Sequence, residues 1–190
     1  MIMFLNDLDI QPNDVALLVI AYHMQAATMG IFTKLEFVNG LTKMKIKSLE
    51  ALKEAIPKLR NQINNTLMFP EIYKFAFNFY KENPQHKSIG LDVADMVLEL
   101  VAQNKAHIAK FRKFLVKQKE YKSINMDQWV NLMDFSQSVD EDLSDYDAES
   151  ASWPFIIDLY VEWVKEGHTG DSEEEKKEEP KKKGEYDFDF

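Results

Sequence analysis

The sequence contains no cysteine, and it has no long apolar run. Without cysteine the chain forms neither disulfides nor thiolate metal sites, and thiol catalysis is excluded. A helix that crosses a bilayer needs about 20 consecutive apolar residues, and no stretch approaches that length. The first residues also lack the basic-then-apolar layout of a secretory signal. These absences predict a cytoplasmic or nuclear protein that does not associate with a membrane.

Glycine is scarce, with six residues in 190, and it forms none of the familiar ligand-binding motifs. The phosphate-binding patterns GxxxxGK and GxGxxG are both absent, as is the GxSxG nucleophile elbow. The four histidines form no HxxxH pair, which argues against a zinc site. The stretches that begin at Asp7 and Asp140 lack the glycine and glutamate of a calcium loop at their sixth and twelfth positions. We therefore expect no metal, no cofactor and no catalytic site.

The net charge of −9 is concentrated in two segments. Residues 139–149 carry six acids and no base, and residues 171–190 carry nine acids against five lysines, so the rest of the chain sums to +1. A nucleic-acid-binding face needs clustered positive charge, so we expect no nucleic-acid partner. The acidic segment 139–149 is either a solvated loop or a surface for a basic protein partner.

Helical periodicity dominates the first 166 residues. The run over 15–24 is apolar on all sides, which is typical of a central, buried helix. Thr33 with Glu36, and Asn125 with Gln128, have the spacing of capping boxes at helix starts. Pro57 is expected either to end a helix or to begin the next one.

Strand signals are nearly absent, and at most a short strand pair is expected near residues 30–32. From about residue 168 the sequence has the charge and proline content of a disordered segment. The sequence thus predicts an all-α fold. One helical domain over residues 1–166, built from two packed and degenerate EF-hand-like helix–loop–helix halves, precedes a disordered charged tail over 167–190.

Short motifs in a fixed order resemble those of a known family. DQW, LMDFS, YD and WPFIID follow one another between Asp127 and Asp158. Together they resemble the end of the potentiating-neddylation domain of the defective-in-cullin-neddylation family. Matching residues extend upstream, so the resemblance covers about residues 1–165.

The resemblance implies a scaffold-type co-ligase that promotes cullin neddylation without catalysing it. Such a protein binds the C-terminal winged-helix region of a cullin and the N-acetylated N-terminal peptide of the neddylation conjugating enzyme. A cullin-associated RING protein would be a third partner. The thiol chemistry would belong to the conjugating enzyme, in keeping with the absence of cysteine. The alternative is a degenerate calcium-type helical adaptor that binds another peptide.

The resemblance also assigns residues to two surfaces. The cullin-binding surface would comprise Asp127, Ser152, Trp153 and Asp158. The pocket for the acetylated methionine would comprise Leu17, Ile20, Phe32, Phe79 and Leu100. Taken alone, Asp127 also suits a helix start, where the dipole favours an anion. Ile20 and Phe79 also suit ordinary core positions.

Overall fold

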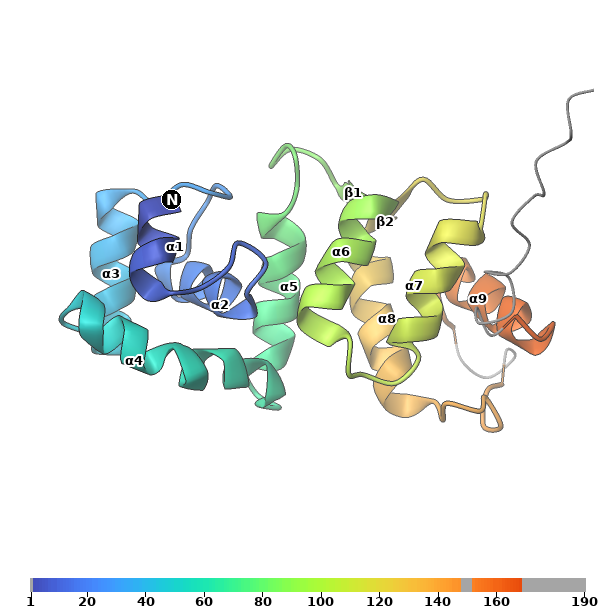
Figure 1. Cartoon of the computed structure of the whole chain (residues 1–190). Coiled ribbons are helices and arrows are strands. Elements are labelled where there is room, and N and C mark those ends of the chain that lie inside the picture. Colours follow the sequence, from blue (N-terminus) through green and yellow to red (C-terminus); the bar gives the residue numbers. More distant parts are fainter. Residues whose placement is uncertain (1, 148–151, 169–190) are drawn as a thin grey trace, which may run out of the picture.

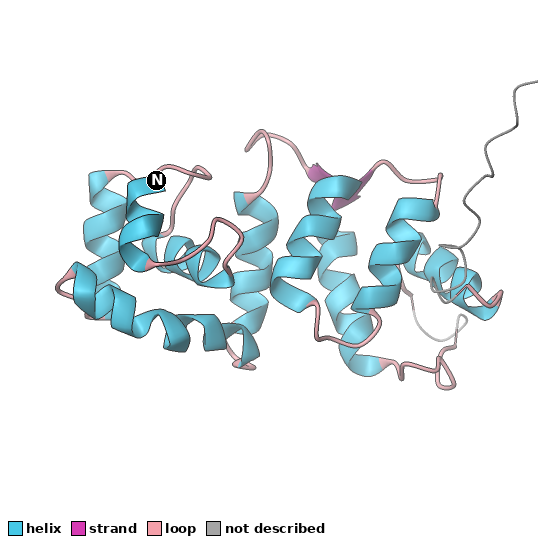
Figure 2. Cartoon of the chain, in the orientation of Figure 1, coloured by secondary structure: helices cyan, strands magenta, loops and turns pink. Residues whose placement is uncertain are grey.

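The computed structural model describes residues 2–147 and 152–168, and within them helices predominate (Figures 1 and 2). The all-α prediction is confirmed. The tail predicted over 167–190 lies outside the described residues from residue 169 onward. No helix in the described part of the chain has both the length and the apolar character needed to cross a membrane.

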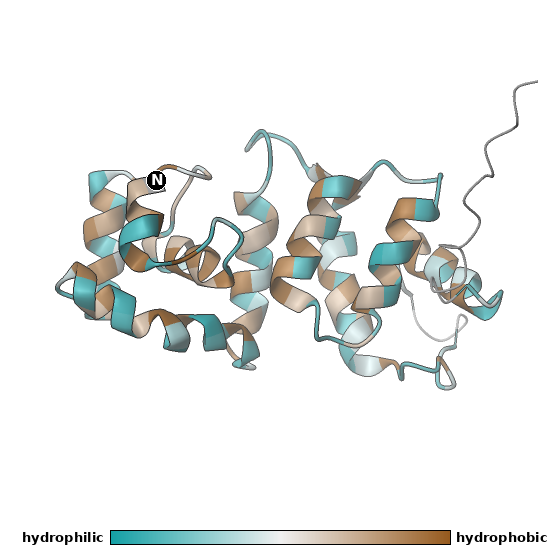
Figure 3. Cartoon of the chain, in the orientation of Figure 1, coloured by the Kyte–Doolittle hydropathy of each residue, from teal (hydrophilic) through white to brown (hydrophobic). Residues whose placement is uncertain are grey.

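The helices form two groups on either side of a central helix (Figure 1). The first group contains α1 (Ile2–Leu8), α2 (Val15–Met24), α3 (Lys34–Met44), α4 (Leu49–Arg60) and a 3-10 turn, η1 (Asn61–Asn64). The central helix is α5 (Phe69–Phe79). The second group contains β1 (Ser88–Gly90), α6 (Leu91–Ala102), α7 (Ile108–Lys117), β2 (Ser123–Asn125), α8 (Met126–Ser138) and α9 (Phe155–Lys165). Hydrophobic and hydrophilic residues alternate along α4 and α7 as expected for helices with one buried face (Figure 3).

The prediction of a buried helix that is apolar on all sides is confirmed for α2, which contacts α3, α4 and α5 and lies at the centre of the first helix group. Asp14 caps its start by accepting a hydrogen bond from the amide of Ala16 at 2.9 Å. Helix α3 approaches α2 closely at Gly40, where any Cβ atom would lie 2.8 Å from the Cα atom of Met24. Only glycine leaves room for this approach, so Gly40 sets the distance between the two helices.

Both predicted capping boxes are present. The hydroxyl of Thr33 accepts from the amide of Glu36 at 3.2 Å, and the Glu36 carboxylate accepts from the amide of Thr33 at 2.7 Å. Asn125 and Gln128 exchange the same pair of bonds at the start of α8. Each box satisfies amides that have no partner within the helix, and it therefore fixes where α3 and α8 begin.

The expectation for Pro57 was wrong, because this residue lies inside α4 and not at a helix end. Proline removes one hydrogen bond to the carbonyl of the residue four positions earlier, here Lys53. Both residues lie on the exposed face of α4, where water can satisfy that carbonyl. The opposite face, with Leu52, Ile56 and Leu59, is buried, and its packing stabilises the helix.

The expectation for strands was also wrong in its position. Near residues 30–32 there is only an isolated bridge between Thr28 and Ile31. The two-stranded sheet instead pairs β1 with β2 in antiparallel register, with Ile89 opposite Ile124. Each strand directly precedes a helix, so the sheet joins the helix–loop–helix unit of α5 and α6 to that of α7 and α8. Strands of three residues are too short to show the alternation by which strands are recognised.

Two aromatic residues connect α5 to α8. The hydroxyl of Tyr73 donates to the carbonyl of Trp129, and the indole nitrogen of Trp129 donates to the carbonyl of Tyr73, both at 3.0 Å. Their rings stack at 4.5 Å with an interplanar angle of 10°. Burial raises the pKa of Tyr73 well above its ordinary value, so this hydroxyl remains a donor. The pair therefore fixes the position of the central helix against the second helix group.

We expect Tyr73→Phe to lower the free energy of unfolding by about 1–2 kcal/mol, because it leaves the aromatic ring but removes a buried hydrogen bond. Urea denaturation followed by circular dichroism measures this loss. Tyr121→Phe is the matched control, since the hydroxyl of Tyr121 makes no hydrogen bond within the described residues. Equal stability of the two variants would contradict the role given to Tyr73.

Candidate binding surfaces

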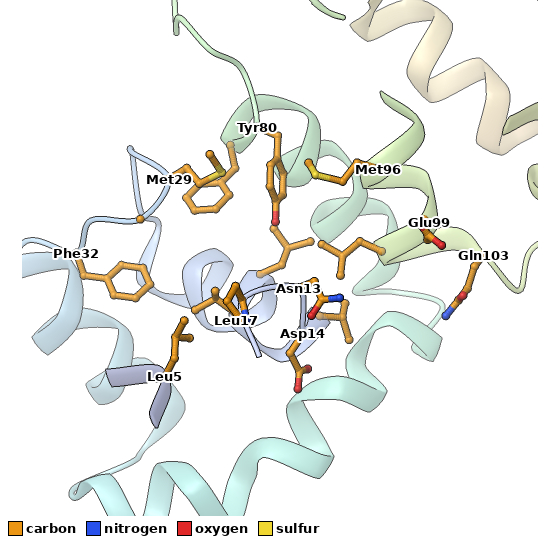
Figure 4. A pocket seen from close by; sticks show the side chains of 16 residues that line it. Leu5, Asn13, Asp14, Leu17, Met29, Phe32, Tyr80, Met96, Glu99 and Gln103 are labelled. Carbon is orange, nitrogen blue, oxygen red and sulfur yellow. The ribbon is translucent and has the colours of Figure 1, made fainter. Parts of the chain in front are cut away.

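A pocket of about 860 Å³ opens between the first helix group and the pair α5–α6 (Figure 4). Its walls come from α1, from the start of α2 and the turn before it, from the loop over residues 29–32, from the end of α5, and from α6. The apolar lining consists mainly of leucine and phenylalanine side chains: Leu5, Leu17, Leu18, Phe32, Phe79 and Leu100. A concave, mostly apolar site of this size suits the side chain and backbone of a peptide end.

The structure brings four of the five residues assigned to the pocket together, namely Leu17, Phe32, Phe79 and Leu100. The fifth, Ile20, is not part of the lining. It lies one turn further along α2 and is fully buried in the core. For Ile20 the ordinary core interpretation therefore describes its position better.

The rim of the pocket includes residues outside the predicted set. Met29 and Met96 are 58% and 47% exposed, and Figure 4 shows them on either side of Tyr80. Along α6 and its C-cap, the spacing of a single helix face relates Met96, Glu99 and Leu100 to Gln103. The helical spacing relative to Leu100 would have been enough to predict the other three residues from the sequence.

Tyr80 adds a polar group to this largely apolar pocket. Its hydroxyl is directed toward the pocket interior (Figure 4), and it makes no hydrogen bond within the described residues. Burial raises the pKa of Tyr80, so the hydroxyl stays neutral. A neutral hydroxyl can donate to a carbonyl or accept from an amide of a bound peptide.

Both carboxylates at the pocket are already paired with arginine. Asp14 accepts from the Nε atom of Arg60 at 3.0 Å. Glu99 accepts from Arg112 at 3.1 Å, and Arg112 also pairs with Asp95 at 2.7 Å. Within the described residues the pocket therefore presents no unpaired carboxylate to a ligand. A neutral ligand group suits it better than an ammonium group.

The residues assigned to the cullin-binding surface lie on two helices and the loop between them. Asp127 is exposed in the first turn of α8, where its carboxylate accepts from the side chain of Asn131 at 3.2 Å. Asp158 lies in the first turn of α9 and accepts a hydrogen bond from the hydroxyl of Tyr146. Ser152 is exposed beside Trp153, whose ring contacts Phe135 at 5.5 Å.

The structure groups Trp153 and Asp158 but not all four residues. Phe135 contacts both Trp153 and Tyr146, and Tyr146 in turn donates to Asp158. Asp127 lies eight residues before Phe135 on α8, a separation of about 12 Å along the helix. Asp127 therefore lies outside the set of contacts that joins Trp153 to Asp158. Burial and the bond to Asp158 raise the pKa of Tyr146, so this phenol remains a donor to the carboxylate.

Within residues 2–147 and 152–168 no three His, Asp or Glu side chains are grouped so that they could hold a metal ion. An all-helical fold with an apolar pocket and a separate acidic surface is typical of a domain that binds other proteins. Comparison with known families identifies the kind of domain. Residues 51–163 match the family model described as cullin binding, and the chain belongs to that family.

Curated relatives support the same assignment. The chain is 35% identical to human DCN1-like protein 5 over 162 residues, which is 85% of this chain and 68% of the relative. It is 37% identical to DCN1-like protein 4 of Danio rerio over 164 residues, which is 86% of this chain and 58% of the relative. The resemblance found in the short motifs is therefore confirmed.

The ion pair at the pocket predicts a pH dependence of stability. Burial alone would raise the pKa of Asp14, but hydrogen bonds from Arg60 and from the amide of Ala16 outweigh it, and the pKa is lowered below its usual 3.8. A carboxyl whose pKa is lower in the folded state stabilises the fold above its unfolded pKa. That contribution disappears as the pH falls through the folded pKa.

We expect Asp14→Asn to lower the free energy of unfolding by about 0.5–1 kcal/mol at neutral pH, because asparagine still caps α2 but loses the ionic pairing. Urea titrations from pH 7 to pH 3 should show a constant difference from the unchanged protein down to about pH 5, and a smaller one below about pH 4. A difference that grew on acidification would refute this role for Asp14.

Proposed function

We propose that this protein is a non-catalytic scaffold that promotes cullin neddylation. In this proposal it binds the C-terminal region of a cullin and, in the apolar pocket, the N-acetylated N-terminal peptide of the neddylation conjugating enzyme. A cullin-associated RING protein completes the assembly, in the cytoplasm or the nucleus. The observation that carries the proposal is an apolar pocket without an unpaired carboxylate among the described residues, in a chain that belongs to the cullin-binding family.

The acidic surface supports the cullin part of the proposal. The Oδ1 atom of Asp158 accepts from Tyr146, and its Oδ2 atom accepts no hydrogen bond within the described residues. That oxygen is available to a lysine or arginine of a partner. Phe155, 61% exposed three residues before Asp158, adds an apolar contact beside the charge. Apolar anchors next to charged groups are typical of protein interfaces.

The pocket supports the peptide part through a charge argument. An unmodified N-terminus carries an ammonium group, and burying it without a partner costs several kcal/mol. Both carboxylates of the pocket are already paired, so neither compensates that charge. Acetylation removes the charge and leaves an amide, for which the hydroxyl of Tyr80 is a neutral partner. A methionine side chain then fills the apolar part of the pocket.

A scaffold of this kind accelerates the reaction by holding its two partners together. Binding both raises the effective concentration of the cullin lysine near the conjugating enzyme, and it restricts their orientation. No reactive group of this chain takes part, and the thioester chemistry stays with the conjugating enzyme.

For the cullin surface we expect Asp158→Ala or Asp127→Ala to weaken binding of a cullin C-terminal fragment by about 2–5 kcal/mol, if each acid pairs with a desolvated base. Affinity should also fall with added salt, because the contact is ionic. Surface plasmon resonance measures both effects.

Glu50→Ala is the matched control for Asp127→Ala, because Glu50 is an exposed acid in the first turn of α4, in the first helix group. It should lose comparable stability without losing affinity. Unchanged cullin affinity in both the Asp127 and the Asp158 variants would remove this surface from the proposal.

For the pocket we expect the acetylated conjugating-enzyme peptide to bind at least about tenfold more tightly than the free-amine peptide, equivalent to about 1.4 kcal/mol. Full burial of the methionine side chain contributes about 1.5–3 kcal/mol to the binding free energy of both peptides. The difference in affinity between them therefore reports the cost of burying the charge. Isothermal titration of the two peptides measures it.

Leu100→Arg places a charge in the wall of the pocket and should abolish binding of the acetylated peptide. Leu67→Arg is its control, because Leu67 is 84% exposed and lies outside the pocket. Equal affinities of the two peptides, or binding that survives Leu100→Arg in a folded protein, would show that the pocket residues serve only as core.

A further inference from the structure

His107, in the turn between α6 and α7, is one of the few polar side chains buried among the described residues, with 3% of its surface exposed. A buried imidazole needs a partner for each ring nitrogen. Its Nε2 atom lies 3.0 Å from the carbonyl of Val139, the residue that follows α8, and its Nδ1 atom lies 3.2 Å from the hydroxyl of Tyr160 on α9. The turn lies next to the end of α8 in Figure 1. One side chain thus joins three helices.

The two partners determine which ring nitrogen carries the proton. A carbonyl can only accept, so Nε2 donates to Val139. In the neutral imidazole Nδ1 then accepts from the hydroxyl of Tyr160. The carbonyl of His107 lies farther from that hydroxyl, at 3.5 Å, so the ring nitrogen is the better acceptor. Burial raises the pKa of Tyr160, so its hydroxyl keeps the proton that this bond needs. The ring is therefore held in one orientation.

The backbone of His107 has a conformation that few residues with a Cβ atom adopt. Its φ is 64° and its ψ is −23°, in the left-handed region, and this conformation costs free energy unless surrounding contacts fix it. His107 is the N-cap of α7, yet its side chain makes no cap hydrogen bond to that helix. The side chain bonds to Val139 and Tyr160 instead. The contacts with α8 and α9 thus account for the strained backbone.

The partners of His107 also support two residues of the cullin-binding surface. Tyr160 lies two residues after Asp158 on α9. The ring of Phe135 on α8 lies 4.8 Å from that of His107 and 5.5 Å from that of Trp153. His107 therefore contacts the residues that carry Trp153 and Asp158, and it does not itself belong to the exposed surface.

We propose that His107 is a positioning residue, which holds the end of α8 against α9 and so keeps Trp153 and Asp158 in one fixed relation. The inference rests on the proposed function only for the identity of the partner. Binding costs less free energy when the contacting groups are ordered beforehand, because no conformational entropy is lost in bringing them together. Loss of His107 should therefore weaken binding at a surface that it does not reach.

Fluorine NMR of the full chain tests the inference without any partner. The chain is labelled with 5-fluorotryptophan, and replacing each of its three tryptophans in turn by phenylalanine assigns the resonances. In His107→Asn the side chain still suits a left-handed backbone and can accept from Tyr160, but it is too short to reach the carbonyl of Val139. We expect the resonance of Trp153 to shift by more than its linewidth. The resonance of Trp129 should stay in place, which verifies that the core is intact.

Tyr160→Phe removes the other bond of His107 and keeps the aromatic ring, so it should shift the resonance of Trp153 as well. Ser136→Ala is the matched control. It removes a hydrogen bond to the same turn, from the hydroxyl of Ser136 to the carbonyl of Ala106 at 2.7 Å, and leaves both bonds of His107 in place. The resonance of Trp153 should not move in this variant.

Surface plasmon resonance with a cullin C-terminal fragment then relates position to binding. His107→Asn and Tyr160→Phe should bind at least about fivefold more weakly than Ser136→Ala, a difference equivalent to about 1 kcal/mol. All three variants should bind the acetylated peptide equally well, because none of these residues lines the pocket.

The NMR result decides the positioning role, and the affinity decides the partner. A Trp153 resonance that stays in place in both His107→Asn and Tyr160→Phe would overturn the inference, as would an equal shift in Ser136→Ala. A shifted resonance with unchanged cullin affinity would support the positioning role and would count against a cullin as the partner of this surface.

Discussion

Tyr73 and Trp129 hold the central helix α5 in a fixed position against α8 of the second helix group, because the side chain of each donates to the backbone carbonyl of the other. Backbone carbonyls are held in place by the helices that carry them. The two bonds therefore define the rotation of α5 about its axis and its position along α8. Phe79, in the pocket wall, lies six residues after Tyr73 on the same helix. Asp127 lies two residues before Trp129 on the other helix. The position of the pocket relative to the acidic surface thus follows from one pair of aromatic residues.

Much of the fold follows from local sequence. The capping boxes at Thr33 and Asn125 were recognisable because the residues that form them are three positions apart. The apolar character of α2 likewise identified it as central. The features that were missed depend on distant partners or on solvent. The pairing of β1 with β2 joins segments about 35 residues apart, as their register shows. Pro57 is tolerated inside α4 only because it faces water, and its sequence neighbours do not reveal that.

The candidate surfaces also combine features that local sequence reveals with features that depend on distant residues. Apolar lining residues such as Leu17 and Leu100 were identified through resemblance, whereas the polar character of the pocket was not. The two arginines that neutralise its carboxylates lie 46 residues from Asp14 and 13 from Glu99. Their arrangement is a property of helix packing and not of any motif. Tyr146 similarly belongs to a matching motif, but only the fold shows that its hydroxyl binds Asp158.

Gly40 has a consequence beyond the spacing of α2 and α3. The loop that carries Phe32 enters α3 directly, and the ring of Phe32 packs against Phe4 of α1 at 5.9 Å. Any side chain at position 40 would push α3 away from Met24, and the loop with Phe32 would move with it. Gly40 therefore affects the width of the pocket although it does not line it. A change in ligand preference can therefore begin at this inter-helix contact and leave the lining residues unchanged.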